Sequence, residues 1–290
     1  MNGARFFRQA KRIELISTKL VENLLAGNYR SVFRGMGIEF DEVREYVSGD
    51  DSRLIDWNVT SRMGSPYTKT FREERELSLF LVVDLSASLS CGTGEVPKSS
   101  SVLMLFAVLA VSAVLNNDRV GAIFFTDRIE RFAAPSKGRK HVLGLLNALI
   151  DARPEGRGSD LALALRTACE SLQRRGICVV LSDFKTEGYW HELSLLARRH
   201  DVIAARILDP ADVEFPEVGT VELEDPESGK SLVSDGLGRR FRQEYRRFWE
   251  EHAFRWREEC RKRGVETLSL TTGDDPGLKL LDFFRRRKRR

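Results

Sequence analysis

The sequence predicts an α/β protein with a doubly wound, mainly parallel sheet, and three observations support this. Apolar stretches typical of strands alternate with stretches of helical spacing from about residue 77 to the end. The first, at 77–84, is a continuous apolar run, which is typical of a central strand covered on both faces. Strand-like stretches at 119–127 and 129–134 are too close for a crossover helix, so we expect one antiparallel strand at an edge of the sheet.

The remaining elements follow from periodicity and from capping residues. Helices are predicted at 102–115, 138–152, 159–176, 188–200, 239–264 and 276–287. Ser159 lies near the N-cap of the third, and Gly176 just past its end. Further strands are predicted at 177–184, 201–210 and 265–272, and a small hairpin at 219–235 turns at Glu227, Ser228 and Gly229. Together these elements place the predicted sheet domain at residues 76–284.

The region before the sheet domain has a different character. Apolar positions at helical spacing predict a helix over 5–26, with Gly27 as its stop. Residues 28–71 mix glycines, aromatic residues and charges without a sustained period, which predicts loops, short turns and at most one strand. Residues 1–75 are therefore expected to form an N-terminal helix and a separate segment.

The chain ends in a cluster of positive charge. The formal net charge is +4, and residues 285–290 are all basic, so the rest of the chain carries −2. A basic tail of this kind is expected to be a solvated end. The alternative is contact with an anionic membrane surface or with nucleic acid.

Cysteine usage and hydropathy predict a cytoplasmic protein. The four cysteines form no C-x-x-C pair and none lies at zinc spacing from a histidine, so reduced thiols are expected. The first twenty residues lack the features of a signal peptide. The longest apolar run, 102–115, is shorter than the ~20 residues of a membrane-spanning helix, so no transmembrane segment is expected.

Oxygen-bearing side chains follow the predicted strands where ligands bind in doubly wound sheets, beyond the carboxyl ends. Two carboxylates and three hydroxyls make up the set: Asp84, Ser86, Ser88, Ser159 and Asp183. Hard cations take such ligands, so the expected metal is Mg²⁺, with Mn²⁺ or Ca²⁺ as alternatives. Because hydroxyls are neutral donors, the cation would readily accept a carboxylate from outside the chain.

The stretches DLSAS, GRGSDL and LSDF resemble the three parts of the metal-ion-dependent adhesion site of von Willebrand factor A domains. That pattern is D-x-S-x-S, then a threonine, then an aspartate. The resemblance implies that Ser86, Ser88 and Ser159 bind the metal directly, while Asp84 and Asp183 act through water or hydrogen bonds. Ser159 departs from the usual threonine and lacks its rotamer-restricting methyl group. The alternative is that Asp84 and Ser159 are caps and Asp183 is a turn residue.

A second resemblance covers the segment upstream of the first strand. Residues 34–62, followed by KTFREERE and then DLSAS, are similar to the bacterial domain-of-unknown-function-58 family, over roughly residues 30–210. The resemblance implies a von Willebrand A-like fold. Family members often accompany MoxR-type AAA ATPases, which implies such an ATPase as the protein partner.

The same segment has its own physical interpretation. Its arginines lie among many acidic residues, which predicts mutual ion pairs and a turn at Gly49, with Tyr46 and Trp57 as packing anchors. The functional alternative is a docking face for a partner.

The sequence favours a binding protein over an enzyme. It has no P-loop and no G-x-S-x-G elbow, and its histidines are scattered. A haloacid-dehalogenase-like phosphatase would need an acid where Ser86 stands. We therefore expect a non-enzymatic, metal-dependent interaction protein. The alternatives are a metal-dependent hydrolase using Asp84, Asp160 and Asp183, and nucleic-acid binding through the tail and helix 239–264. Nucleic acid is not the expected partner, because glutamates interleave the arginines of that helix.

Overall fold

The computed structural model describes residues 38–73, 77–93, 96–215, 217, 219–224, 226–227, 229–235 and 238–288. The helix predicted over 5–26 lies outside these residues. The chain divides into two compact units, here called the hairpin unit (within Phe33–Leu77) and the sheet unit (within Ser78–Arg290).

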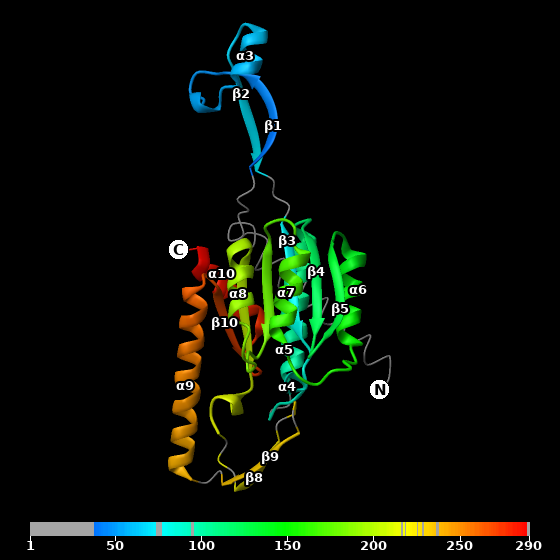
Figure 1. Ribbon diagram of the computed structural model, residues 1–290, viewed down its shortest axis with the longest axis vertical. Helices are drawn as coiled ribbons and strands as arrows, with labels where there is room; N and C mark the ends of the chain where they lie inside the picture. The colour runs from blue at the N-terminus through cyan, green and yellow to red at the C-terminus, as the bar shows by residue number, and fades with distance from the viewer. Residues whose placement is uncertain are drawn as a thin grey trace. The chain divides into compact units, whose positions relative to one another are not determined.

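The sheet unit is built on a six-stranded sheet of order β10-β7-β6-β3-β4-β5 (Figure 1). All neighbouring strands are parallel except β4 and β5, which are antiparallel. The predicted fold class, with its antiparallel edge, is confirmed. The strands are β3 (Ser78–Asp84), β4 (Arg119–Phe125), β5 (Ile129–Ser136), β6 (Ile177–Ser182), β7 (Asp201–Leu208) and β10 (Glu266–Thr271).

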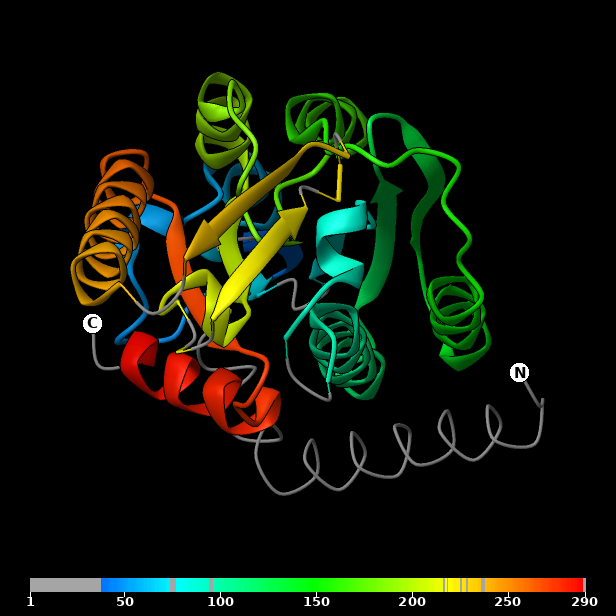
Figure 2. The same cartoon turned by 90° about the horizontal axis from the view of Figure 1, so that it is seen from below.

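Helices cover both faces of this sheet (Figure 2). One face carries α5 (Lys98–Leu115), α6 (Arg139–Ile150) and α10 (Pro276–Lys288), and the other carries α7 (Leu161–Ser171), α8 (Trp190–Arg199) and α9 (Arg239–Lys262). The central strand β3 is buried on both sides, as its unbroken apolar run predicts: Leu79 to Val83 are at most 1% exposed.

Helix α5 is apolar on all sides because it lies in the core. By length and composition it is the one helix among the described residues that could cross a membrane, yet 61% of its residues are buried inside the protein. Phe106, for example, stacks edge-on against Phe124 of β4 at 5.9 Å between ring centroids. The helix is thus accounted for as a core element of the sheet unit.

Helix α7 ends earlier than predicted. Its last residue is Ser171, and Leu172 takes an extended conformation that places its side chain in the core. Gly176 therefore does not cap the helix. It precedes β6, where a Cβ atom would lie 2.5 Å from the carbonyl oxygen of Ser78.

The C-terminal third adds a hairpin and two helices. The predicted hairpin is present as β8 (Thr220–Glu224) and β9 (Ser231–Asp235), with Gly229 at a φ of 70°. Helix α10 runs on to Lys288, so the first residues of the basic tail continue the helix, with Arg285 and Arg286 exposed to solvent. Arg287 pairs with Asp201 and Glu266, which holds the end of the helix on the sheet unit.

The hairpin unit contains more regular structure than predicted. It has two antiparallel strands, β1 (Ile38–Glu45) and β2 (Tyr67–Glu73), with a short 3-10 helix η1 (Ser52–Leu54) and α3 (Trp57–Met63) between them. Asp56 caps α3 by accepting hydrogen bonds from the amides of Asn58 and Val59. The expectation of at most one strand was wrong, because the mixed residues around β1 and β2 hide their alternation.

The charges of the hairpin unit pair with one another around the turn at Gly49, whose φ is 112°. Arg44 contacts Asp50 at 2.7 Å, and Arg53 contacts Asp51 at 2.7 Å. Trp57 does not act as a packing anchor, since its side chain is 70% exposed.

Candidate metal centre

The candidate site lies at the carboxyl ends of β3 and β6, which are neighbours in the sheet. The chain leaves β3 toward β4 through a helix on one face and reaches β6 through a helix on the other, so this is the switch point of the sheet. After Asp84 the chain forms the short helix α4 (Ala87–Ser90), which is tied to the neighbouring loop by a hydrogen bond from the Ala87 amide to the Arg157 carbonyl at 2.9 Å.

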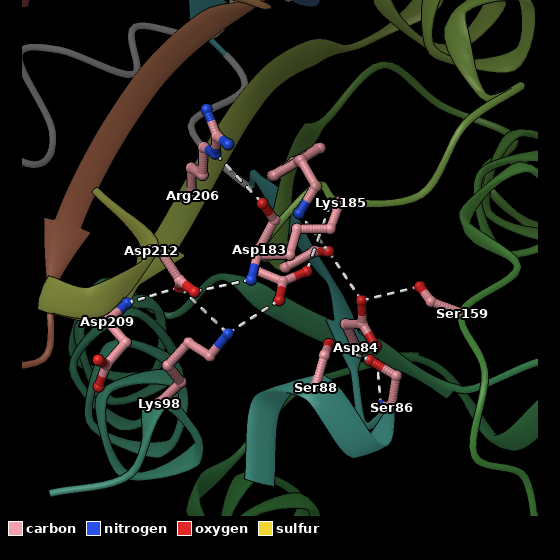
Figure 3. A network of polar contacts seen from close by, with 12 residues as sticks. Asp84, Ser86, Ser88, Lys98, Ser159, Asp183, Lys185, Arg206, Asp209 and Asp212 are labelled. Carbon is pink, nitrogen blue, oxygen red and sulfur yellow. Dashed lines mark hydrogen bonds and ion pairs between the residues drawn. The ribbon is translucent and has the colours of Figure 1, made fainter. Parts of the chain in front are cut away.

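Asp84 is the centre of the hydroxyl cluster (Figure 3). It is 1% exposed. Its Oδ1 accepts a hydrogen bond from the Ser86 amide at 2.8 Å, and its Oδ2 accepts hydrogen bonds from the hydroxyls of Ser159 at 2.9 Å and Ser182 at 2.7 Å. One carboxylate thus joins three segments of the chain.

Burial destabilises the ionised form of the Asp84 carboxyl group unless a positive charge lies beside it. Desolvation and, secondly, the nearby negative charge of Asp183 raise the pKa of Asp84 to about 6, although its hydrogen bonds oppose the rise. A carboxylate held in this way gains from a cation placed beside it.

The two serines after Asp84 turn their hydroxyls toward each other. The Oγ atoms of Ser86 and Ser88 are 3.1 Å apart, and both side chains are buried. Their alternation along the loop brings the two oxygens to one side, next to Asp84 (Figure 3).

Ser159 reaches the site because it is not the cap of α7. Asp160 is the N-cap, and its Oδ1 accepts the amide hydrogen of Leu163 at 2.9 Å. The hydroxyl of Ser159 is therefore free to bond to Asp84, and the N-cap alternative for Ser159 was wrong. The same geometry turns the Asp160 carboxylate to the start of its own helix rather than to Asp84.

Asp183 lies beside this cluster but has a different partner (Figure 3). Its Oδ2 accepts a hydrogen bond from the Nζ of Lys98 at 3.0 Å. The same Nζ lies 3.3 Å from Asp212 in the short 3-10 helix η2 (Pro210–Asp212). Asp212 is in turn held by Lys185 at 2.7 Å. The structure thus brings Asp84, Ser86, Ser88 and Ser159 into one hydrogen-bonded group, with Asp183 next to it in an ion-pair network.

Lys98 is buried with only 3% of its side chain exposed. Burial alone would lower its pKa, but the carboxylates of Asp183 and Asp212 raise it, so the ammonium group stays charged. The pKa of Asp212 is lowered although burial opposes this, because Lys185 and Lys98 lie beside it.

Arg206 of β7 supports Asp183 from the other side. Its Nε donates to the Asp183 carbonyl oxygen at 3.2 Å, and its guanidinium group lies 5.3 Å from the centre of the Trp256 ring. Because Trp256 belongs to α9, the strand end that carries Asp183 is linked to the long charged helix.

The donor set fits a hard cation in its chemistry. Hydroxyl and carboxylate oxygens from three segments meet at one buried point, as oxygen-preferring cations require. Across the described residues, no group of three or more His, Cys, Asp or Glu side chains could hold a metal ion, so a cation here would depend on the serine hydroxyls as well as on the carboxylates. Ser182 and Lys98 were not identified from the sequence as residues of the site. Ser182 could have been found, because it directly precedes Asp183 in the LSDF stretch, whereas no local sequence pattern points to Lys98.

Comparison with known proteins gives the family. A model described as "Protein of unknown function DUF58" matches residues 42–255. The uncharacterized protein Rv1480 of Mycobacterium tuberculosis is 32% identical over 283 residues, covering 96% of this chain and 89% of that protein. An uncharacterized protein of Mycobacterium bovis matches with the same values.

Solved structures with a similar arrangement include von Willebrand factor A-like domains. The conserved hypothetical protein BatB from Bacteroides thetaiotaomicron is 16% identical, with a TM-score of 0.49, covering 74% of this chain and 100% of that one. A von Willebrand factor type A protein from Catenulispora acidiphila is 12% identical, with a TM-score of 0.41, covering 77% and 43%. None of these names indicates an enzymatic activity. By the match over most of its length, the chain belongs to the DUF58 family.

Proposed function

We propose that this protein is a metal-dependent protein–protein interaction module. The metal is Mg²⁺, or Mn²⁺ or Ca²⁺ in its place, held by Ser86, Ser88 and Ser159, with Asp84 and Asp183 acting through water or hydrogen bonds. The observation that carries the proposal is the meeting of Asp84 with the hydroxyl groups of two other segments at the switch point.

The proposed binding step uses the neutral character of the hydroxyl ligands. A cation with few charged ligands remains electron-poor, and a hard cation in such a site keeps waters that can be exchanged. When such a cation is bound, an Asp or Glu side chain of the partner would take the place of one of these waters. Loops around the site then add contacts that select the partner.

We further propose that the partner is a MoxR-type AAA ATPase in the cytoplasm, with this chain as its adaptor or co-chaperone. The resemblance of the upstream segment supports the choice of partner. The hairpin unit also offers a surface of its own, since Trp57 is 70% exposed and Met63 60% exposed. Exposed aromatic and methionine side chains are enriched at protein interfaces.

The proposal is tested first by metal binding. Isothermal titration of the full chain with MnCl₂ and MgCl₂ should give saturable binding, which Ser86→Ala should abolish. Ser90→Ala is the matched control, because Ser90 is the last residue of the short helix α4 that follows Ser86, and it is exposed. If Ser86→Ala binds the metal as well as Ser90→Ala does, the proposed metal site is refuted.

The interaction is tested separately by pull-down of a MoxR-type ATPase. Capture should fail in EDTA and with Ser86→Ala, and should persist with Ser90→Ala. Capture that ignores both chelator and Ser86→Ala would refute the metal mechanism. Failure of capture with intact metal binding would refute only the choice of partner.

A further inference from the structure

The side chain of Lys98 places a positive charge of the chain itself beside the candidate metal centre. Lys98, at the start of α5, is 85 residues from Asp183 in sequence, yet its ammonium group lies 3.0 Å from the carboxylate. Both side chains are 3% exposed. An ion pair removed from water to this extent is expensive to build, and replacing such pairs by apolar groups is often neutral or stabilising. Stability alone therefore does not explain why this ion pair lies beside the candidate metal centre.

We infer that Lys98 is an internal counter-cation that competes with the metal for Asp183 and so limits the affinity of the site. The inference rests on the proposed function. Without Lys98, a divalent cation would face two carboxylates, Asp84 and Asp183. With Lys98 in place, Asp183 is neutralised, and the cation experiences a net charge of one carboxylate.

The network around Lys98 shows why this competition is adjustable. The ammonium group is shared between Asp183 and Asp212, at 3.0 and 3.3 Å. When a cation draws on Asp183, Lys98 keeps a carboxylate partner in Asp212 and is not left as an unpaired buried charge. Asp212 is well suited to this role because its other oxygen is already held by Lys185.

A weakly held metal also suits the proposed binding step. A cation whose charge is poorly compensated by the protein gains more from the carboxylate of a partner. Lys98 therefore makes metal binding and partner binding depend on each other. The ion pair with Lys98 neutralises the carboxylate of Asp183, and a carboxylate of the partner supplies the missing negative charge. The role of Lys98 is to position and neutralise Asp183, without contacting the partner.

Lys185 provides a matched control within the same network. It is also a lysine that pairs with Asp212, at 2.7 Å, but its side chain is 31% exposed and its ammonium group pairs with Asp212 rather than with Asp183. Loss of Lys185 changes the total charge of the region by the same amount as loss of Lys98. A difference between the two variants thus reports the contact with Asp183.

The experiment is titration of Mn²⁺ into the full chain at pH 7.5, followed by the paramagnetic signal of free Mn²⁺. Lys98→Met should bind Mn²⁺ at least about tenfold more tightly than wild type, which is ~1.4 kcal/mol. Lys185→Met should stay within about twofold of wild type, and Lys98→Arg, which keeps the charge, should do the same. Unchanged or weaker binding by a folded Lys98→Met overturns the inference, as does an equal gain in Lys185→Met.

A second variant covers the case in which Lys98→Met does not fold. Asp212→Asn leaves Lys98 with Asp183 as its charged partner, so Mn²⁺ binding should weaken by several-fold. Unchanged or tighter binding by Asp212→Asn overturns the inference.

The outcomes separate this inference from the proposed function. Wild-type binding that is lost in Ser86→Ala, together with unchanged Lys98→Met, refutes only the role of Lys98. No binding by either wild type or Lys98→Met refutes both. Binding that emerges only in Lys98→Met, and is lost again in the double variant with Ser86→Ala, supports the competition.

Discussion

Replacing Asp84 by asparagine should stabilise the metal-free protein at neutral pH. The folded protein raises the pKa of this carboxyl group from 3.8 to about 6. Keeping it ionised above pH 6 therefore costs about 3 kcal/mol of folding free energy, at 1.36 kcal/mol per pKa unit. Asparagine carries no charge and removes this cost. It also accepts fewer hydrogen bonds from Ser86, Ser159 and Ser182, so a net gain of roughly 1–2 kcal/mol is expected.

The effect has a defined pH dependence. Because the folded-state pKa is raised, the folded wild type binds a proton between pH 6 and 3.8 that the unfolded chain does not. The penalty is complete above about pH 6 and disappears as the pH falls toward 3.8. The advantage of Asp84→Asn should therefore be largest at pH 7.5 and much smaller at pH 4.5.

Thermal and urea unfolding in EDTA at both pH values measure this difference. For a protein of this size, 1 kcal/mol corresponds to a shift of roughly 2–4 °C in Tm. Asp183→Asn is the control, because it removes a partner of the buried Lys98 and should destabilise the protein by about 3 kcal/mol. An Asp84→Asn protein that is less stable than wild type at pH 7.5, or a difference that ignores pH, would refute the reasoning.

Two further predictions concern packing, and urea unfolding measures both. Gly176→Ala should lower the free energy of unfolding by about 1–3 kcal/mol, because its Cβ would lie 2.5 Å from the Ser78 carbonyl oxygen. Gly144→Ala should instead raise it by roughly 0.5–1 kcal/mol, because Gly144 lies inside α6 and its Cβ would meet nothing within 4 Å. Trp57→Ala should change the free energy of unfolding by less than about 0.5 kcal/mol, since the side chain is 70% exposed, whereas Trp256→Ala at 3% should cost about 3–5 kcal/mol. An equal effect of the two glycine or the two tryptophan variants would contradict the burial on which each prediction rests.

The fold was predictable because the sheet unit obeys simple periodicities. The unbroken apolar run of β3 reports burial on both faces, and the short gap between β4 and β5 leaves no room for a crossover helix. Element ends were less predictable. Helix α7 stops at Ser171 because Leu172 turns into the core, a tertiary contact that helix propensity does not register.

The candidate site was predictable only where its residues sit in local patterns. Asp84, Ser86 and Ser88 form a recognisable string, and Ser159 and Asp183 flank predicted elements. Lys98 has no such mark, because a lysine at a helix start is usually solvated and its pairing with Asp183 exists only once α5 packs on the sheet against β3 and β7. The prediction for Trp57 was wrong because the described part of the hairpin unit, two strands and two short helices, leaves its side chain 70% exposed.

Strand β5 has a consequence for how copies of the protein can meet. An edge strand with free amide and carbonyl groups is a template on which another chain can extend a sheet. Pro135 near the end of β5 has no amide hydrogen to offer, and Glu130 and Arg131 place charges along the strand. This edge is therefore a poor partner for edge-to-edge growth, and association of copies through it is disfavoured.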